Sequence, residues 1–120
     1  MTTILHITSR TEWQAAQQRG AYRAPSLETE GFIHCSTEKQ VLHVANAFYR
    51  GQNNLVLLVI DEARVQPEVR WEPPAGKPAP GISPSDRFPH IYGPINLNAV
   101  VRVVDLQPDP AGTFSLPPLG

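Results

Sequence analysis

The sequence predicts an α+β fold, in which two short helices pack on a mixed or antiparallel sheet within one domain. A length of 120 residues suits a single domain with a core of its own. Helix-type and strand-type patterns alternate only in the first half of the chain. The later strand-like segments follow one another without helices between them, which favours an α+β sheet over a doubly wound parallel one.

The first strand is expected over residues 4–8, where apolar and polar side chains alternate between two faces. A short helix should follow, because Thr11 to Gln14 has the spacing of a capping box and Gly20 is a typical stop signal. Residues 21–30 are expected to form a connection, since Pro25 interrupts a helical pattern.

A second strand is expected over residues 31–36, within the segment GFIHCST. The helix predicted over residues 38–50 has the capping-box spacing from Thr37 to Gln40, and Gly51 closes it. Its apolar positions recur at helical spacing and predict one buried face. These positions are Val41, Val44, Ala45 and Phe48.

The second half of the chain should add strands to the sheet. Residues 55–61 are almost wholly apolar, which is typical of a central strand covered on both faces. A short strand is expected over residues 69–72, and a last one, rich in valine, over residues 99–106. Proline recurs through residues 73–94 and predicts an ordered loop or flap. The domain is expected to span residues 1–107, followed by a loosely held proline-rich tail over 108–120.

Composition limits the classes of function. The net charge of −1 provides no global field that would attract nucleic acid or a membrane. No apolar stretch approaches the length of a membrane span, and the N-terminus lacks a signal-peptide pattern. A single cysteine excludes an internal disulfide. We expect a cytoplasmic protein, a monomer or a homodimer, with a small molecule as its partner. GxxxxGK, GxGxxG and GxSxG motifs do not occur.

Polar residues fall at the same phase of the two early strands. His6 and Thr8 share one face of the first strand, and His34 and Ser36 share one face of the second. If these strands pair, the two histidines should meet. Ser36 also precedes a helix, where backbone N–H groups favour an anion. The alternative for each histidine is a structural hydrogen bond to a backbone carbonyl.

The later segments add further candidates. FPHIYGPI places His90 and Tyr92 in a proline-framed loop, where they either bind a ligand or anchor the loop. Glu72 ends a strand, where a carboxylate could bind a sugar hydroxyl or stabilise positive charge at a reacting carbon. The alternative is a surface ion pair between Glu72 and Arg70. Arg87 could contact an anionic ligand.

Metal binding and cysteine chemistry are weaker hypotheses. Zinc would require Cys35 together with the histidines, but alternation turns Cys35 away from His34, and no CxxC or HxxxH spacing occurs. We therefore expect no metal site. The same geometry argues against a cysteine nucleophile and predicts that Cys35 lies in the core.

Four segments in order, ILHIT, GFIHCST, RWE and FPHIYGPI, resemble the domain of unknown function 952 family over residues 2 to about 106. This family is placed by distant similarity among folds related to ADP-ribosyltransferases, including RNA 2′-phosphotransferases. The resemblance implies a compact α+β domain with a split sheet, of ADP-ribosyltransferase-like fold, and a cleft that could hold NAD. It implies that His6 holds a ribose and that Glu72 binds the nicotinamide ribose. His34 and Ser36 stand where such folds usually have an aromatic or hydroxyl residue, a departure from the usual His-Tyr-Glu set.

Two hypotheses of function follow. The first is an ADP-ribosyltransferase-like enzyme that acts on NAD or a related nucleotide, with NAD as substrate and no cofactor expected. The second is a non-catalytic module that binds a small molecule or nucleotide in a degenerate site. The candidate catalytic residues are Glu72, His34 and His90. The candidate ligand-binding residues are His6, Thr8, Ser36, Arg87 and Tyr92.

Overall fold

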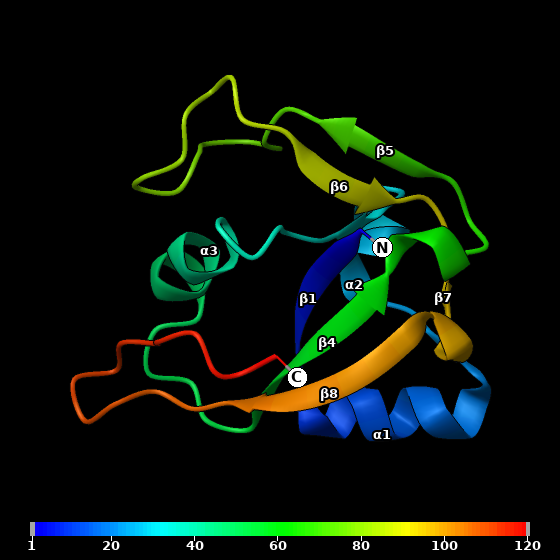
Figure 1. The fold of residues 1–120 in the computed structure, drawn as a ribbon, viewed down its shortest axis with the longest axis horizontal. Helices are drawn as coiled ribbons and strands as arrows, with labels where there is room; N and C mark the ends of the chain where they lie inside the picture. Colours follow the sequence, from blue (N-terminus) through cyan, green and yellow to red (C-terminus); the bar gives the residue numbers. More distant parts are fainter. Residues whose placement is uncertain (1, 120) are drawn as a thin grey trace.

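The computed structural model describes residues 2–119 and contains three small antiparallel sheets (Figure 1). The first has the order β1-β4-β8, built from β1 (Thr3–Ser9), β4 (Leu55–Asp61) and β8 (Val100–Leu106). As expected for a central strand, every residue of β4 is buried. The predicted strands over 4–8, 55–61 and 99–106 are thus confirmed to within a residue or two.

Two smaller sheets complete the domain. The second pairs β2 (Ala21–Tyr22) with β7 (Ile95–Asn96). The third has the order β3-β6-β5, built from β3 (Ile33–His34), β6 (Phe88–Ile91) and β5 (Val69–Glu72). The strands thus form three separate sheets, which agrees with the split sheet that the family resemblance implies. All the strand pairings among the described residues are antiparallel.

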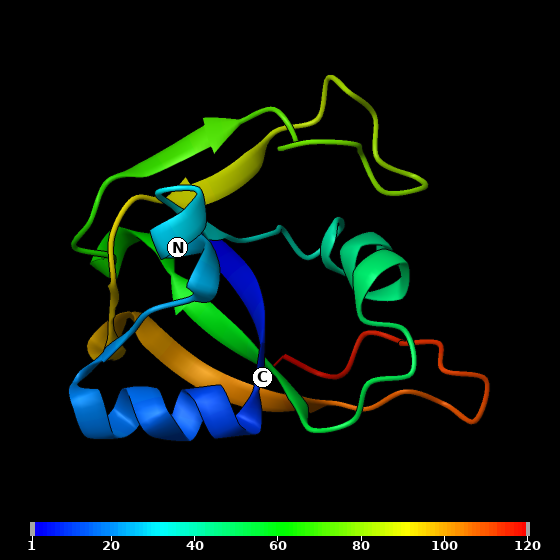
Figure 2. The same ribbon diagram turned by 180° about the vertical axis from the view of Figure 1, so that it is seen from behind.

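The described part of the chain contains three short α-helices, one more than expected. They are α1 (Arg10–Arg19), α2 (Pro25–Thr29) and α3 (Val41–Phe48), with short 3₁₀ turns η1 (Glu62–Arg64) and η2 (Leu97–Ala99). Figures 1 and 2 show α3 between the proline-rich loop and the C-terminal segment, apart from α1. No helix within residues 2–119 has the length and apolar content needed to cross a bilayer.

Two helix starts differ from the prediction. The N-cap of α1 is Ser9, whose hydroxyl accepts the Glu12 N–H at 3.0 Å, so the expected cap at Thr11 is wrong. Gly20 does end this helix, in the left-handed conformation (φ 89°). The segment 21–30, expected to be a connection, contains the helix α2. Pro25 does not interrupt this helix because it lies in the first turn, where the missing N–H has no helical partner.

The helix α3 is shorter than the predicted span of 38–50. Its start is preceded by a turn in which the Gln40 side chain accepts the Thr37 N–H at 2.9 Å, so one half of the expected capping box forms. Val41 and Ala45 are buried as predicted, but Phe48 is 61% exposed. The apolar face of α3 is therefore narrower than its sequence pattern indicates.

The segment 73–94 is not a continuous loop, because β6 lies within it. Pro89 occupies this central strand, where proline is uncommon. Its carbonyl accepts the Cys35 N–H at 3.1 Å, while the pairing of β3 with β6 covers only two residues. A proline is tolerated there because few ladder hydrogen bonds from β3 need its missing N–H.

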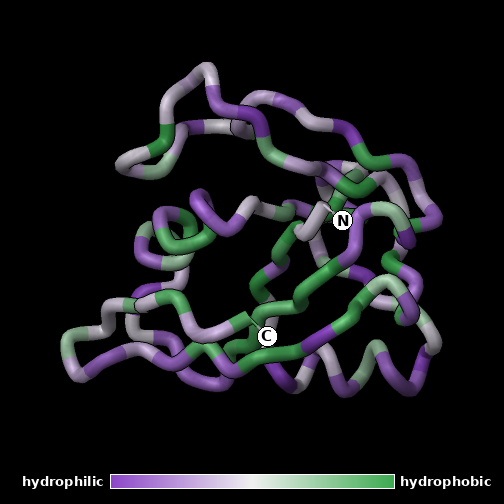
Figure 3. Tube along the Cα trace, in the orientation of Figure 1, coloured by the Kyte–Doolittle hydropathy of each residue, from purple (hydrophilic) through white to green (hydrophobic). Residues whose placement is uncertain are grey.

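Two apolar clusters lie on opposite faces of the β1-β4-β8 sheet. One includes Ile4, Trp13 and Tyr22, and the other includes Leu5 and Phe114. Figure 3 shows the apolar colouring that runs along the strands of this sheet. Phe114 is only 2% exposed, so the expectation of a loosely held tail is wrong where this residue packs.

Candidate functional site

A cavity of about 650 Å³ lies between β1, the segment around β3, α3 and the loop that follows β5. Three of the four histidines of the chain, His6, His34 and His90, line it. Thr8 and Ser36 add hydroxyl groups. The volume falls within the range typical of small-molecule sites, roughly 300–1,000 Å³.

The cavity opens where β1 separates from the segment of β3. Leu5 and Ser36 exchange two backbone hydrogen bonds of 2.8 Å, but His34 pairs with β6 and not with β1. Antiparallel alternation turns the N–H and C=O of Ile7 to the same edge as those of Leu5. Within residues 2–119 these two groups have no hydrogen-bond partner on that edge, so a bound molecule could use them.

On β1, His6 belongs to a buried polar chain. Its Nδ1 lies 2.5 Å from the backbone oxygen of His34, and its Nε2 lies 2.8 Å from the Tyr22 hydroxyl. The Tyr22 oxygen lies 2.9 Å from Thr8 Oγ1. The expected meeting of the first two strands thus occurs through the ring of His6 and the backbone of His34.

The protons in this chain can be assigned. Burial lowers the pKa of His6 from 6.5 to about 4 and raises the pKa of Tyr22 to about 12, so both are neutral near pH 7. A carbonyl can only accept, so the single ring proton of His6 is on Nδ1. Nε2 then accepts from Tyr22, whose oxygen is left to accept from Thr8. All polar atoms of this chain are satisfied, which makes His6 a structural residue of the cavity wall.

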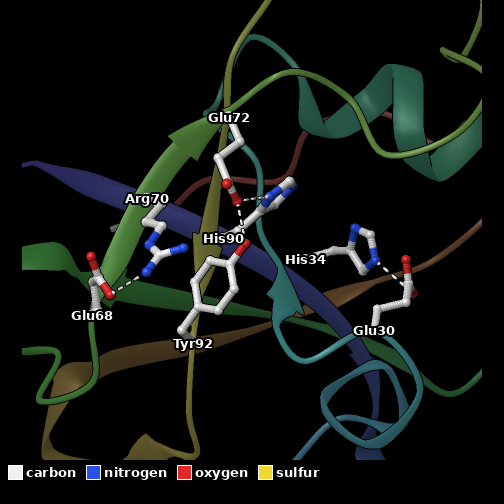
Figure 4. Close-up of polar contacts among 7 residues, drawn as sticks. All are labelled: Glu30, His34, Glu68, Arg70, Glu72, His90 and Tyr92. Carbon is white, nitrogen blue, oxygen red and sulfur yellow. Dashed lines mark hydrogen bonds and ion pairs between the residues drawn. The ribbon is translucent and has the colours of Figure 1, made fainter.

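A second polar cluster lies on one face of the β3-β6-β5 sheet (Figure 4). His34, His90 and Arg70 are direct partners across its three strands. Direct antiparallel partners project their side chains on the same face. Residues that are distant in sequence are therefore brought into one row.

Glu72 and Tyr92 complete the cluster around His90. The Nδ1 of His90 lies 2.9 Å from Glu72 Oε1, and the Tyr92 hydroxyl donates to the same oxygen at 2.6 Å. These two hydrogen bonds hold the pKa of Glu72 below its usual value, and the bond from Tyr92 has the larger effect. The pKa of His90 is lowered by burial, although the bond to Glu72 opposes this effect. Glu72 is thus an anion and His90 is neutral near pH 7.

The expected alternative for Glu72, an ion pair with Arg70, does not form. Arg70 pairs with Glu68 at 3.0 Å, and its guanidinium carbon lies 4.5 Å from the centre of the Tyr92 ring. Glu72 therefore hydrogen-bonds to His90 and Tyr92, as Figure 4 shows.

His34 lies at the exposed side of the cavity with a carboxylate of its own. Its Nε2 is 2.9 Å from Glu30 Oε2, and 44% of its side chain is exposed. The ring of Phe32 stacks on His90 at 4.1 Å between centroids and lies 4.8 Å from that of His34. Phe32 thus packs against both imidazoles.

The structure brings together most of the residues selected from sequence, but not all of them on the cavity. His6, Thr8, His34, Ser36 and His90 line the cavity. Glu72 and Tyr92 do not line it: Glu72 is bonded to the lining residue His90, and Tyr92 is bonded to Glu72. Arg87 is exposed and outside the lining, and the part of it that forms a bond is its carbonyl, which accepts from Gln40.

Sequence reasoning missed three residues of the site. Tyr22 and Glu30 lie in the segment 21–30, which the sequence predicts as a connection, and no local pattern indicates that their side chains hydrogen-bond to histidines. Strand alternation does predict that Phe32 shares a face with His34 and Ser36, but an apolar ring at that position does not by itself indicate a site residue.

Cys35 lies in the core, as its phase predicts. It is 3% exposed and belongs to the same apolar cluster as Tyr22, and burial raises the pKa of its thiol. Among the described residues, no group of three or more histidine, cysteine or acidic side chains is arranged to hold a metal ion.

Together, fold and site define a small α+β protein with three antiparallel sheets and a histidine-lined cavity. The chain belongs to the family described as "Protein of unknown function (DUF952)", whose model matches residues 7–103. The resemblance to this family is thereby confirmed over residues 7–103. None of the curated proteins compared with the chain matches it.

The chain is also similar to solved structures of protein CC0527 from Caulobacter crescentus. The crystal structure has 35% sequence identity and a TM-score of 0.82, covering 96% of this chain and 95% of that chain. A double mutant of CC0527 gives the same values. The solution NMR structure has 36% identity and a TM-score of 0.75, covering 94% and 91%.

Proposed function

We propose that the cavity binds a small nucleotide-like molecule, such as NAD or a related nucleotide. The observation that carries this proposal is that three of the four histidines line one cavity of about 650 Å³. A volume of this size, with few polar groups on an apolar wall, is typical of small-molecule sites.

The lining has two kinds of surface that suit the two ends of a nucleotide. Phe48, Tyr49 and Phe88 provide aromatic surface for a base. Ser36 and His34 provide polar groups, and Lys77 brings a positive charge from the loop after β5. A phosphate would be attracted to Lys77 and hydrogen-bonded by the Ser36 hydroxyl.

Isothermal titration calorimetry with NAD, ADP-ribose and AMP tests the proposal. We expect binding to the wild-type protein, and at least about tenfold weaker binding in Ser36→Ala and His34→Gln, since each loses a polar contact of about 1.5 kcal/mol. His43→Gln is the matched control, because His43 is exposed on α3 and does not line this cavity. Absence of binding for all three compounds would refute the proposal.

The ADP-ribosyltransferase-like hypothesis concerns what happens after binding. It requires Glu72 to stabilise positive charge on the ribose, and Glu72 is linked to the cavity through His90. Release of nicotinamide from NAD that is lost in Glu72→Ala would support glycosyl transfer. Binding of NAD without release would support the alternative, a non-catalytic binding module.

A further inference from the structure

We propose that His90 accepts a proton from a hydroxyl group of the molecule in the cavity, or from water beside it, and that Glu72 holds the ring in the tautomer that this requires. The inference rests on the proposed function, since it assigns chemistry to the same cavity. It gives Glu72 a positioning role and leaves contact with the ligand to His90.

The first argument is the assignment of the ring proton. Glu72 is an anion and can only accept, so the proton of neutral His90 is on Nδ1, 2.9 Å from Glu72 Oε1. The Tyr92 hydroxyl occupies the same carboxylate oxygen and keeps it in place. The Nε2 of His90 therefore has a free lone pair.

The second argument is access to that lone pair. His90 is 3% exposed, yet it is a lining residue of the cavity. Within residues 2–119, no buried side-chain nitrogen or oxygen lacks a hydrogen-bond partner. No partner of Nε2 is present, so this nitrogen reaches the open space of the cavity. A hydroxyl group placed there would donate to it.

The third argument is that the other histidines are less suited to this role. Both ring nitrogens of His6 are already hydrogen-bonded in the core. His34 lies in contact with solvent and uses Nε2 to bind Glu30. His43 is exposed on α3, outside the cavity lining. His90 combines a carboxylate on one nitrogen with an accessible second nitrogen in a sheltered site.

The charges around His90 favour this role. Glu72 from β5 and Glu30 beyond α2 stabilise its protonated form, whereas burial and His34 from β3 oppose it. When Nε2 takes the proton, an O–H bond breaks and an N–H bond forms, and the imidazolium is stabilised by Glu72. The oxygen keeps the electron pair and attacks an electrophilic carbon or phosphorus. The proton then passes from Nε2 to the leaving oxygen, which restores neutral His90. The reaction class is hydrolysis or group transfer at an ester or phosphoester.

Two measurements on the full chain test the inference. Heteronuclear NMR of the histidine rings should show the His90 proton on Nδ1 at neutral pH, and Glu72→Gln should lower the His90 pKa, because the carboxylate that stabilises imidazolium is gone. Hydrolysis of p-nitrophenyl acetate, with water as the hydroxyl donor, should fall at least about tenfold in His90→Gln and fall in Glu72→Gln. His43→Gln should hydrolyse it at the wild-type rate. Circular dichroism checks that each variant is folded.

The outcomes separate this inference from the proposed function. A proton on Nε2, or hydrolysis that is unchanged in His90→Gln, would overturn the role of His90 even if NAD binds. Hydrolysis that depends on His90 and Glu72 would uphold that role even if NAD, ADP-ribose and AMP all fail to bind.

Discussion

His34 and His90 are direct partners across β3 and β6, and their ring centroids lie 5.5 Å apart in an edge-to-face arrangement. Each ring is bound to its own carboxylate, Glu30 for His34 and Glu72 for His90. Two histidine–glutamate pairs therefore meet at one cavity, one exposed to solvent and one sheltered. Five predictions follow from this arrangement and from the packing that supports it.

Acidification should destabilise the protein before its carboxylates titrate. The pKa of buried His6 is about 4 in the folded state against 6.5 ordinarily, so the unfolded chain binds protons first as the pH falls. The stability that neutral His6 contributes is fully present above pH 6.5, and it is lost as the pH falls from 6.5 to about 4. By pH 5 the loss should reach about 2 kcal/mol. Urea unfolding at pH 7.5 and pH 5 measures it. His6→Gln should show a shallower dependence, and an equal loss in that variant would contradict the prediction.

Tyr22→Phe should destabilise the fold by about 1–3 kcal/mol, because it leaves His6 Nε2 and the Thr8 hydroxyl without their buried partner. Tyr49→Phe makes the same chemical change at a partly buried tyrosine whose hydroxyl has no hydrogen-bond partner within residues 2–119, and it should cost much less. Urea unfolding of both variants provides the comparison. Equal costs would show that the His6–Tyr22–Thr8 chain does not stabilise the fold.

Cys35 should be inert towards thiol reagents in the folded protein. Its side chain is buried in the apolar core and burial raises its pKa, so the reactive thiolate is scarce even though Cys35 borders the cavity. Labelling with a disulfide reagent should be slow in buffer and become fast in urea. Fast labelling of the folded protein would mean that Cys35 reaches solvent through the cavity.

Phe114→Ala should destabilise the protein by about 3 kcal/mol, since Phe114 is 2% exposed in the core. Its backbone N–H also donates to Asn46 at 2.7 Å, which joins the tail to α3. Phe48→Ala removes the same ring from a side chain that is 61% exposed, and should cost less than about 0.5 kcal/mol. Thermal or urea unfolding checks both. Similar small effects would restore the expectation of a loose tail.

Tyr92→Phe should raise the pKa of Glu72, because it removes the stronger of the two hydrogen bonds that hold this carboxylate ionised. The His90–Glu72 bond remains, so the His90 proton should stay on Nδ1. Carboxylate NMR titration follows Glu72, and ring nitrogen shifts follow His90. An unchanged Glu72 pKa would show that the Tyr92 hydroxyl does not reach it in solution.

Local pattern predicted much of the fold correctly. Strand alternation placed Cys35 in the core and His34 on the opposite face, and the apolar run over residues 55–61 predicted the central strand. Helix ends were predicted less well, because Ser9 competes with Thr11 as the cap and Pro25 starts a helix as readily as it interrupts one.

The sequence by itself determined which side chains face together within a strand, since that depends only on a two-residue period. It also determined the family, through segments that carry the histidines. Only the tertiary structure decided that His34 pairs with His90 and that Glu72 binds His90 in preference to Arg70. It also decided that the Tyr22 hydroxyl hydrogen-bonds to His6. The physical reason is that strand partners far apart in sequence are selected by register and packing over the whole sheet, which no short window of sequence contains.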